Sequence, residues 1–220
     1  SLRNDLNGHL SFYKGITYEV ILNLVESYDI DGVFFDRTFE PELDHSDLLL
    51  IRELNNRGCK VGYTSFRTLW NIPEIKNKDN APYKVFTPFY RKGCMAQRTP
   101  ELPLDRPTCS HLKSFENGEH LEQVHSLPTL GWVQSIVEGW EISEKGAEAQ
   151  LESFLHNGLS HYKSGRNFPS KPYVSRLSPY IHFGQLSIRR IYHDAIAVGS
   201  GPDLDHFISE LGWREFSYYL

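Results

Sequence analysis

The strongest constraint on the fold is an alternation of helical and strand patterns between residues 18 and 64. Apolar residues at helical spacing predict helices over 18–28 and 47–57, and short apolar runs predict strands over 30–35 and 59–64. Strands that alternate with helices form parallel sheets with crossover helices, as in nucleotide-binding folds. The sequence therefore predicts a Rossmann-like parallel-sheet domain over residues 1–90, although it contains neither a G-x-G-x-x-G run nor a P-loop.

The pattern changes after residue 90. Residues 91–130 carry four prolines among polar residues and show no sustained periodicity, which predicts a long linker. Beyond the linker the periodicity is helical, with helices predicted over 147–159, 188–198 and 204–220. The expected N-caps are Ser143 and Ser187, and the expected C-terminal stops are Gly58 and Gly199. The predicted fold class is α/β followed by all-α, with the helical domain over 131–220.

Composition excludes several classes of protein. No run approaches the 18 or so apolar residues of a membrane helix, which predicts no membrane partner. The three cysteines are odd in number and lack zinc-ligand spacing, so neither a disulfide framework nor a metal site is expected. We expect a cytoplasmic monomer. A net charge of −5 opposes non-specific binding of nucleic acid by the whole surface, but it leaves room for a local basic groove.

A basic stretch stands out against this acidic background. Residues 153–193 contain no Asp or Glu, whereas six Lys and Arg residues lie within them. One interpretation is that an anion binds here, and the other is a solvated basic face that is offset elsewhere.

Within this stretch, the run 174–184 has the pattern of an anion cradle. Ser178 is a predicted N-cap and Pro179 a favourable first helical residue, with Ser175 and Arg176 directly before them. First-turn N–H groups at the positive end of a helix bind phosphates. From spacing alone, an anion-binding site and a simple helix start explain these residues equally well.

The run 210–216 is the second candidate. On a helix, Glu210, Trp213 and Arg214 occupy positions i, i+3 and i+4 of one face. A carboxylate beside an indole suits a stacked base whose edge is hydrogen-bonded. From spacing alone, a Glu210–Arg214 ion pair beside a core tryptophan is favoured over that interpretation.

Taken together, six ordered runs resemble the DNA photolyase/cryptochrome flavoprotein family from end to end. The runs are 34–41 (FFDRTFEP), 82–89 (PYKVFTPF), 140–147 (WEISEKGA), 162–169 (YKSGRNFP), 175–184 (SRLSPYIHFG) and 210–216 (ELGWREF). The resemblance implies a partial antenna domain over 1–90, an interdomain linker over 91–130 and the first helices of the helical FAD-binding domain over 131–220. It also implies light-driven repair of cyclobutane pyrimidine dimers in DNA by electron transfer from reduced FAD, the deoxyribodipyrimidine photo-lyase reaction.

The resemblance assigns roles to individual residues. Glu210 and Trp213 match catalytic residues that face the dimer, and Arg214 matches a residue between flavin and DNA. Val174 stands where the family usually has Thr, which removes one hydroxyl contact. The residues that match flavin contacts are Tyr162, Val174, Ser175, Arg176, Leu177, Ser178 and Arg214.

Three points follow from the same comparison. A cryptochrome photoreceptor without repair activity is the alternative function, and Glu210 and Trp213 favour repair. A second, antenna chromophore can accompany FAD, but residues 39–43 do not match the folate-binding pattern, so its identity is left unknown. The chain is expected to be a fragment truncated at both ends, inactive and weak in FAD binding by itself, with the activity belonging to its full-length parent.

Overall fold

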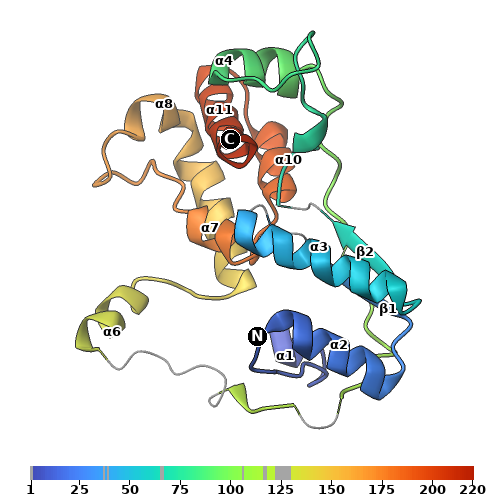
Figure 1. Ribbon diagram of the computed structural model, residues 1–220. Helices are drawn as coiled ribbons and strands as arrows, with labels where there is room; N and C mark the ends of the chain where they lie inside the picture. The colour runs from blue at the N-terminus through green and yellow to red at the C-terminus, as the bar shows by residue number, and fades with distance from the viewer. Residues whose placement is uncertain are drawn as a thin grey trace. The chain divides into compact units, whose positions relative to one another are not determined.

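The computed structural model of the protein (Figure 1) describes residues 2–36, 38, 40–64, 67–105, 107–115, 118–121 and 130–220. The chain forms two compact units. The first comprises Ser1–Ser65 and Arg106–Ile136, and the second comprises Phe66–Asp105 and Val137–Leu220. Each unit has its own cluster of buried apolar side chains.

The first unit is built on a parallel pair of strands. Within its described residues, β1 (Gly32–Asp36) pairs with β2 (Lys60–Thr64) in parallel, with Gly32 opposite Lys60 and Asp36 opposite Thr64. Helix α3 (Pro41–Asn56) is the crossover between the strands, and α2 (Thr17–Tyr28) precedes β1. Two short helices, α1 (Leu2–Asp5) and α6 (Gly131–Val137), lie near the two ends of the unit's sequence. The buried cluster comprises Leu22, Val25, Leu50, Leu54 and Cys59. These findings confirm the predicted α/β fold with a parallel sheet.

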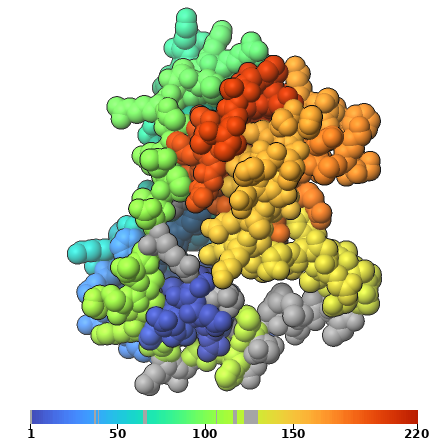
Figure 2. All heavy atoms as spheres, turned by 180° about the vertical axis from the view of Figure 1, so that it is seen from behind, coloured from blue at the N-terminus to red at the C-terminus, as the bar shows by residue number. Residues whose placement is uncertain are grey.

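The second unit is helical. The longest helix, α11 (Pro202–Tyr219), contacts four short helical segments and α10 (Ile188–Val198). The short segments in contact with α11 are η1 (Ile72–Glu74), η2 (Phe89–Cys94), η3 (Leu159–His161) and α8 (Tyr162–Gly165). The unit also contains α4 (Phe86–Pro88), α7 (Glu144–Asn157) and α9 (Ser178–His182). Figure 2 shows part of the red C-terminal helix at the surface, next to the green segment that contains α4 and η2.

Several predicted helix boundaries are confirmed. The hydroxyl of Ser143 accepts a hydrogen bond from the N–H of Gly146 at 2.9 Å, and that of Ser187 accepts from Arg189 at 3.2 Å. Helix α10 ends at Val198, directly before Gly199, and Gly58 has φ +75° just after α3. Helix α3, however, begins at Pro41 instead of residue 47, because a proline in the first turn is preset for a helix start.

The two units divide the chain at other positions than the predicted ranges 1–90, 91–130 and 131–220. Leu69, Trp70, Ile72 and Ile75 are buried in the core of the helical unit, so the chain leaves the α/β unit soon after β2. The predicted linker is itself divided between the units. Its part before residue 106 joins the helical unit, and the later part joins the first unit, where a bridge pairs Phe12 with Glu119. Residues 106, 116, 117 and 122–129 of this range lie outside the described residues, as do residues 37 and 39.

Among the described residues, no helix is both long and apolar enough to cross a membrane.

We expect Gly146→Ala to destabilise the helical unit. Alanine is favoured over glycine inside a helix by about 1 kcal/mol, but a Cβ at this position would overlap the backbone carbonyl oxygen of Glu141. Overlap with a backbone atom costs more than the gain in propensity, so the free energy of unfolding should fall by about 1–3 kcal/mol. Urea denaturation measures this change. Lys145→Ala, at an exposed neighbouring position, should change it by no more than about 0.5 kcal/mol, and an equal loss in both variants would contradict the explanation.

Candidate functional site

Helix α11 carries Glu210, Trp213 and Arg214, but it directs them to three different sets of partners. Glu210 forms an ion pair with Arg166, which follows α8. His206, one turn earlier on α11, lies beside both, with its Nε2 3.1 Å from Nη1 of Arg166 and 3.8 Å from Oε1 of Glu210. Glu210 is therefore paired with Arg166, and the imidazole of His206 lies close to both side chains.

Trp213 lies on the outside of the helix. Its side chain is 46% exposed, and its ring stacks on Phe86 with centroids 3.8 Å apart and an interplanar angle of 12°. Phe86 in turn stacks on Tyr90, with centroids 5.4 Å apart. The three rings form an ordered aromatic column with the indole near the surface.

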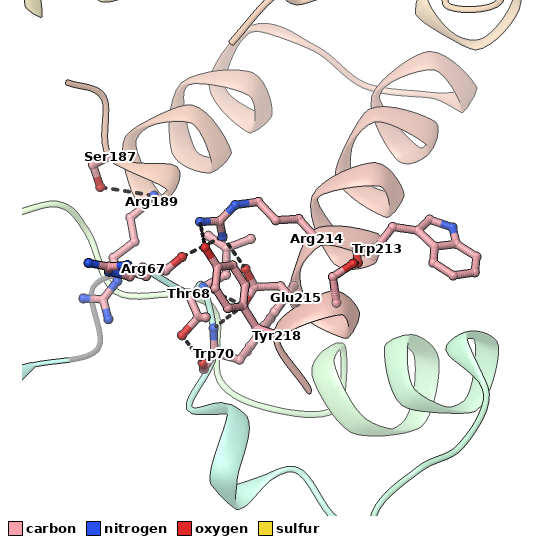
Figure 3. A network of polar contacts seen from close by, with 11 residues as sticks. Arg67, Thr68, Trp70, Ser187, Arg189, Trp213, Arg214, Glu215 and Tyr218 are labelled. Carbon is pink, nitrogen blue, oxygen red and sulfur yellow. Dashed lines mark hydrogen bonds and ion pairs between the residues drawn. The ribbon is translucent and has the colours of Figure 1, made fainter. Parts of the chain in front are cut away.

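Arg214 points to the other side of the helix (Figure 3). Its Nη1 donates to the backbone oxygen of Arg67 at 2.6 Å and to Oε1 of Glu215 at 3.2 Å, and its guanidinium lies 4.8 Å from the ring centroid of Tyr218. Arg214 thus connects α11 to the segment that follows β2.

These contacts correct the expectation that the three residues share one face. Successive helical residues point about 100° apart, and in this helix the divergence takes Trp213 and Arg214 to different partners. The simpler alternative is also wrong, because Glu210 pairs with Arg166 instead of Arg214 and Trp213 is exposed instead of buried. Helical spacing could not predict Arg166 as the partner of Glu210, because Arg166 lies in a distant part of the sequence.

The run 174–178 lies in an unusual backbone conformation. Arg176 has φ +54°, a region that non-glycine residues seldom adopt and that often marks functional sites. Three contacts fix the run: the carbonyl of Ser175 accepts from Nε2 of Gln150 at 2.9 Å, the guanidinium of Arg176 lies 4.4 Å from the ring centroid of Trp140, and Leu177 is buried in the core. Val174 is half-buried at the start of the run.

The predicted cap at Ser178 is wrong. Ser178 is the first residue of α9, and Leu177 occupies the cap position with no side-chain hydrogen bond to the helix. Ser178 is exposed, as is Arg176.

Tyr162 lies beside the cluster that Arg166, His206 and Glu210 form. Its side chain is buried, with Phe154 and Phe207 packed edge-on against the ring. Burial raises the pKa of its hydroxyl, with a smaller opposing effect from Arg166. The phenol therefore stays neutral and can offer a hydrogen bond.

Carboxylates from outside the basic stretch offset part of its charge. Arg166 pairs with Glu210, Arg189 with Glu101 at 2.9 Å, and Arg190 with Asp194. For these three cations the interpretation of a locally offset basic face holds. Arg176 stacks on an aromatic ring instead.

Glu215 is a residue that the sequence interpretation missed. It is fully buried, and its Oε2 accepts hydrogen bonds from the backbone N–H groups of Leu69 at 2.8 Å and Trp70 at 3.5 Å (Figure 3). Burial raises the pKa of its carboxyl to about 7, although Arg214 and the two N–H groups act in the opposite direction. The signal in the sequence was a glutamate on the apolar face of a helix, one turn after Leu211.

We expect the raised pKa of Glu215 to make stability depend on pH. The folded protein binds the proton more tightly than the unfolded chain, so this group's contribution to stability is greatest below about pH 4.5 and is lost as the pH rises to about 7. Between about pH 5 and pH 8 the wild type should lose about 2–3 kcal/mol that Glu215→Gln does not lose. Urea denaturation at the two pH values measures the difference. Parallel pH profiles for the two proteins would show that the carboxyl titrates normally.

Comparison with known proteins finds similar sequences. The family model described as DNA photolyase matches residues 1–108. The deoxyribodipyrimidine photo-lyase of Agrobacterium fabrum is 29% identical over 218 residues, which cover 97% of this chain and 45% of the relative. Cryptochrome-1 of Arabidopsis thaliana is 22% identical over 91% of this chain and 31% of the relative.

A solved structure extends the agreement to the fold. The crystal structure of a class III photolyase from Agrobacterium tumefaciens superposes with a TM-score of 0.83 at 29% identity, covering 93% of this chain and 43% of that one. An α/β unit followed by a helical unit is thus the architecture of the antenna domain and the start of the helical domain of a photolyase. The chain is thus similar, over most of its length, to members of the DNA photolyase/cryptochrome family. It spans less than half the length of these relatives.

Proposed function

We propose that the protein, as the complete gene product, is a deoxyribodipyrimidine photo-lyase that repairs cyclobutane pyrimidine dimers in DNA. The observation that carries the proposal is the pairing of a surface indole on an aromatic column with a half-buried carboxylate three residues earlier on the same helix, α11. Stacking and edge recognition are the two interactions that a flipped base requires. The relatives named as photo-lyases support the same assignment.

We place FAD against the run 174–178, with Tyr162 and Arg214 as further contacts. The residues fit such a group in two respects. Arg176 and Ser178 are exposed, and Arg176 has the positive φ that commonly accompanies ligand contacts. When bound, FAD would supply the electron that splits the dimer under light.

The chain's own residues would bind and orient the lesion. Trp213 offers the face of its indole to a pyrimidine, and Glu210 offers a carboxylate oxygen to an N–H group on the base edge. Arg166 holds that carboxylate by charge. Arg214 would contribute charge between flavin and DNA, in keeping with the role of the matching family residue.

Further parts of this proposal are a second, antenna chromophore, a monomeric state and a cytoplasmic location. Absorbance of the purified protein, analytical ultracentrifugation and cell fractionation test them in turn.

The decisive experiment measures light-dependent loss of dimers from an irradiated oligonucleotide, using the complete gene product with its flavin reduced. Repair in the light and none in the dark supports the proposal. A protein that retains flavin and leaves the dimers intact would instead be a cryptochrome photoreceptor. A protein that binds neither flavin nor dimer would contradict both functions.

We expect Trp213→Ala to weaken dimer binding in the dark by about 1–3 kcal/mol, roughly 5- to 150-fold, because the stacking surface is lost. Trp213→Phe should recover part of this loss. Fluorescence anisotropy with a dimer-containing oligonucleotide measures the affinity. The control is Trp132→Ala, an exposed tryptophan in α6 of the first unit, which should bind as the wild type does. Equal affinity of Trp213→Ala and wild type would remove Trp213 from the site.

We expect Arg176→Ala to lower flavin retention, since a charged hydrogen-bond donor beside a phosphate contributes about 1.5–3 kcal/mol. The ratio of flavin to protein absorbance after gel filtration measures retention. The matched control, Arg190→Ala, removes an arginine whose ion pair lies on α10 and should keep the wild-type ratio. Undiminished flavin in Arg176→Ala would contradict the phosphate role.

A further inference from the structure

We infer that His206 is a positioning residue, which fixes Arg166 and through it the carboxylate of Glu210 for the dimer. The inference rests on the proposed function, because the contact between Glu210 and the dimer is part of that proposal. His206 is not among the residues that the family resemblance assigns.

The hydrogen-bond chemistry of the cluster determines the state of the imidazole. Nη1 of Arg166 lies 3.1 Å from Nε2 of His206 and pairs with Oε1 of Glu210. A guanidinium has only donors, so Nε2 must accept, and the proton of a neutral imidazole must then lie on Nδ1. Nη1 carries two hydrogens, which serve one acceptor each. The geometry thus requires a neutral His206 in the Nδ1–H form.

The partners of His206 explain why this arrangement is stable. Arg166 follows α8 with its guanidinium 5.9 Å from the ring centroid of Tyr162, whose ring lies 6.2 Å from that of His206. The backbone N–H of Lys163 on α8 donates to Oδ1 of Asp203 on α11 at 2.8 Å, which fixes the two helices beside each other. The imidazole and the carboxylate thus both contact Nη1 of the Arg166 guanidinium.

The consequence concerns the second carboxylate oxygen of Glu210, Oε2. An ion pair between two partly exposed side chains, here 31% for Arg166 and 26% for Glu210, has little intrinsic rigidity. The imidazole adds a second point of attachment to Arg166, which limits the orientations of the pair. Glu210 then presents its other oxygen in one direction before a base arrives, and this preorganisation favours binding.

The first test is spectroscopic and needs neither flavin nor DNA. Long-range nitrogen–proton correlation spectra of the 220-residue chain near pH 8 report the tautomer of each histidine, and the signal lost in His206→Gln identifies His206. We expect an unprotonated Nε2. Arg166→Leu should move His206 toward the Nε2–H form, whereas the control Arg190→Leu should not. A protonated Nε2 in the wild type, or a tautomer unchanged in Arg166→Leu, would overturn the inference.

The second test measures dimer affinity in the dark with the complete gene product. His206→Phe keeps a ring of similar size but loses the acceptor, and it should bind the dimer about five- to tenfold more weakly with its flavin content retained. His206→Gln places an amide oxygen near the position of Nε2 and should recover most of the affinity. The control is His156→Phe on α7, whose ring bonds the backbone oxygen of Glu152 within its own helix.

The outcomes separate the two proposals. Wild-type affinity in His206→Phe, or an equal loss in the Phe and Gln variants, would overturn the positioning role. Failure of the wild-type protein to bind dimers at all would contradict the proposed function and, with it, the role of Glu210. The tautomer would then still report whether Arg166 and His206 are bonded as described.

Discussion

The second unit depends on a carboxylate that is buried where carboxylates seldom lie. Glu215 accepts the backbone N–H groups of Leu69 and Trp70, so the chain that leaves the parallel strands is attached to the last helix. A buried N–H without an acceptor is costly, and these two are satisfied by a side chain far away in the sequence. Arg214 reinforces the attachment through the carbonyl of Arg67. This explains why the residues that follow β2 belong to the helical unit.

Helix α11 supports the candidate site because it carries core side chains on one face and candidate site residues on another. The face that carries Leu211 and Glu215 is buried, whereas Glu210 and Trp213 are partly or largely accessible. One helix thus anchors the core and presents the site. The geometry of the site therefore follows from the packing of the same element that holds the unit together.

Much of the fold could be predicted from local patterns. Helix α10 was predicted with both of its ends, because amphipathic spacing, a serine cap and a glycine stop all act within a few residues. The start of α3 was missed because the proline signal at residue 41 lies before the amphipathic repeat. The compact units differ from the predicted ranges because Leu69 and Trp70 are buried in one core with residues of α11, and no local pattern encodes that burial.

The same limit applies to the site. The helical spacing predicted that Glu210 lies near Arg214, but in the structure its carboxylate pairs with Arg166. The family resemblance assigned roles to these residues and did not identify their partners. In the sequence, the burial of Glu215 was indicated only by the position of a glutamate on the apolar face of a helix. Side-chain partners that come from distant segments require the folded chain, because helical periodicity describes neighbours along one element only.

The stack between Phe86 and Trp213 also bears on how a base would approach under the proposed function. An indole has two faces, and Phe86 covers one of them at a centroid distance of 3.8 Å. Under the proposed function, a pyrimidine would therefore stack on the opposite face, as the next ring of a column that already contains Tyr90, Phe86 and Trp213. The side from which the base enters would then be set by a phenylalanine that lies behind the indole.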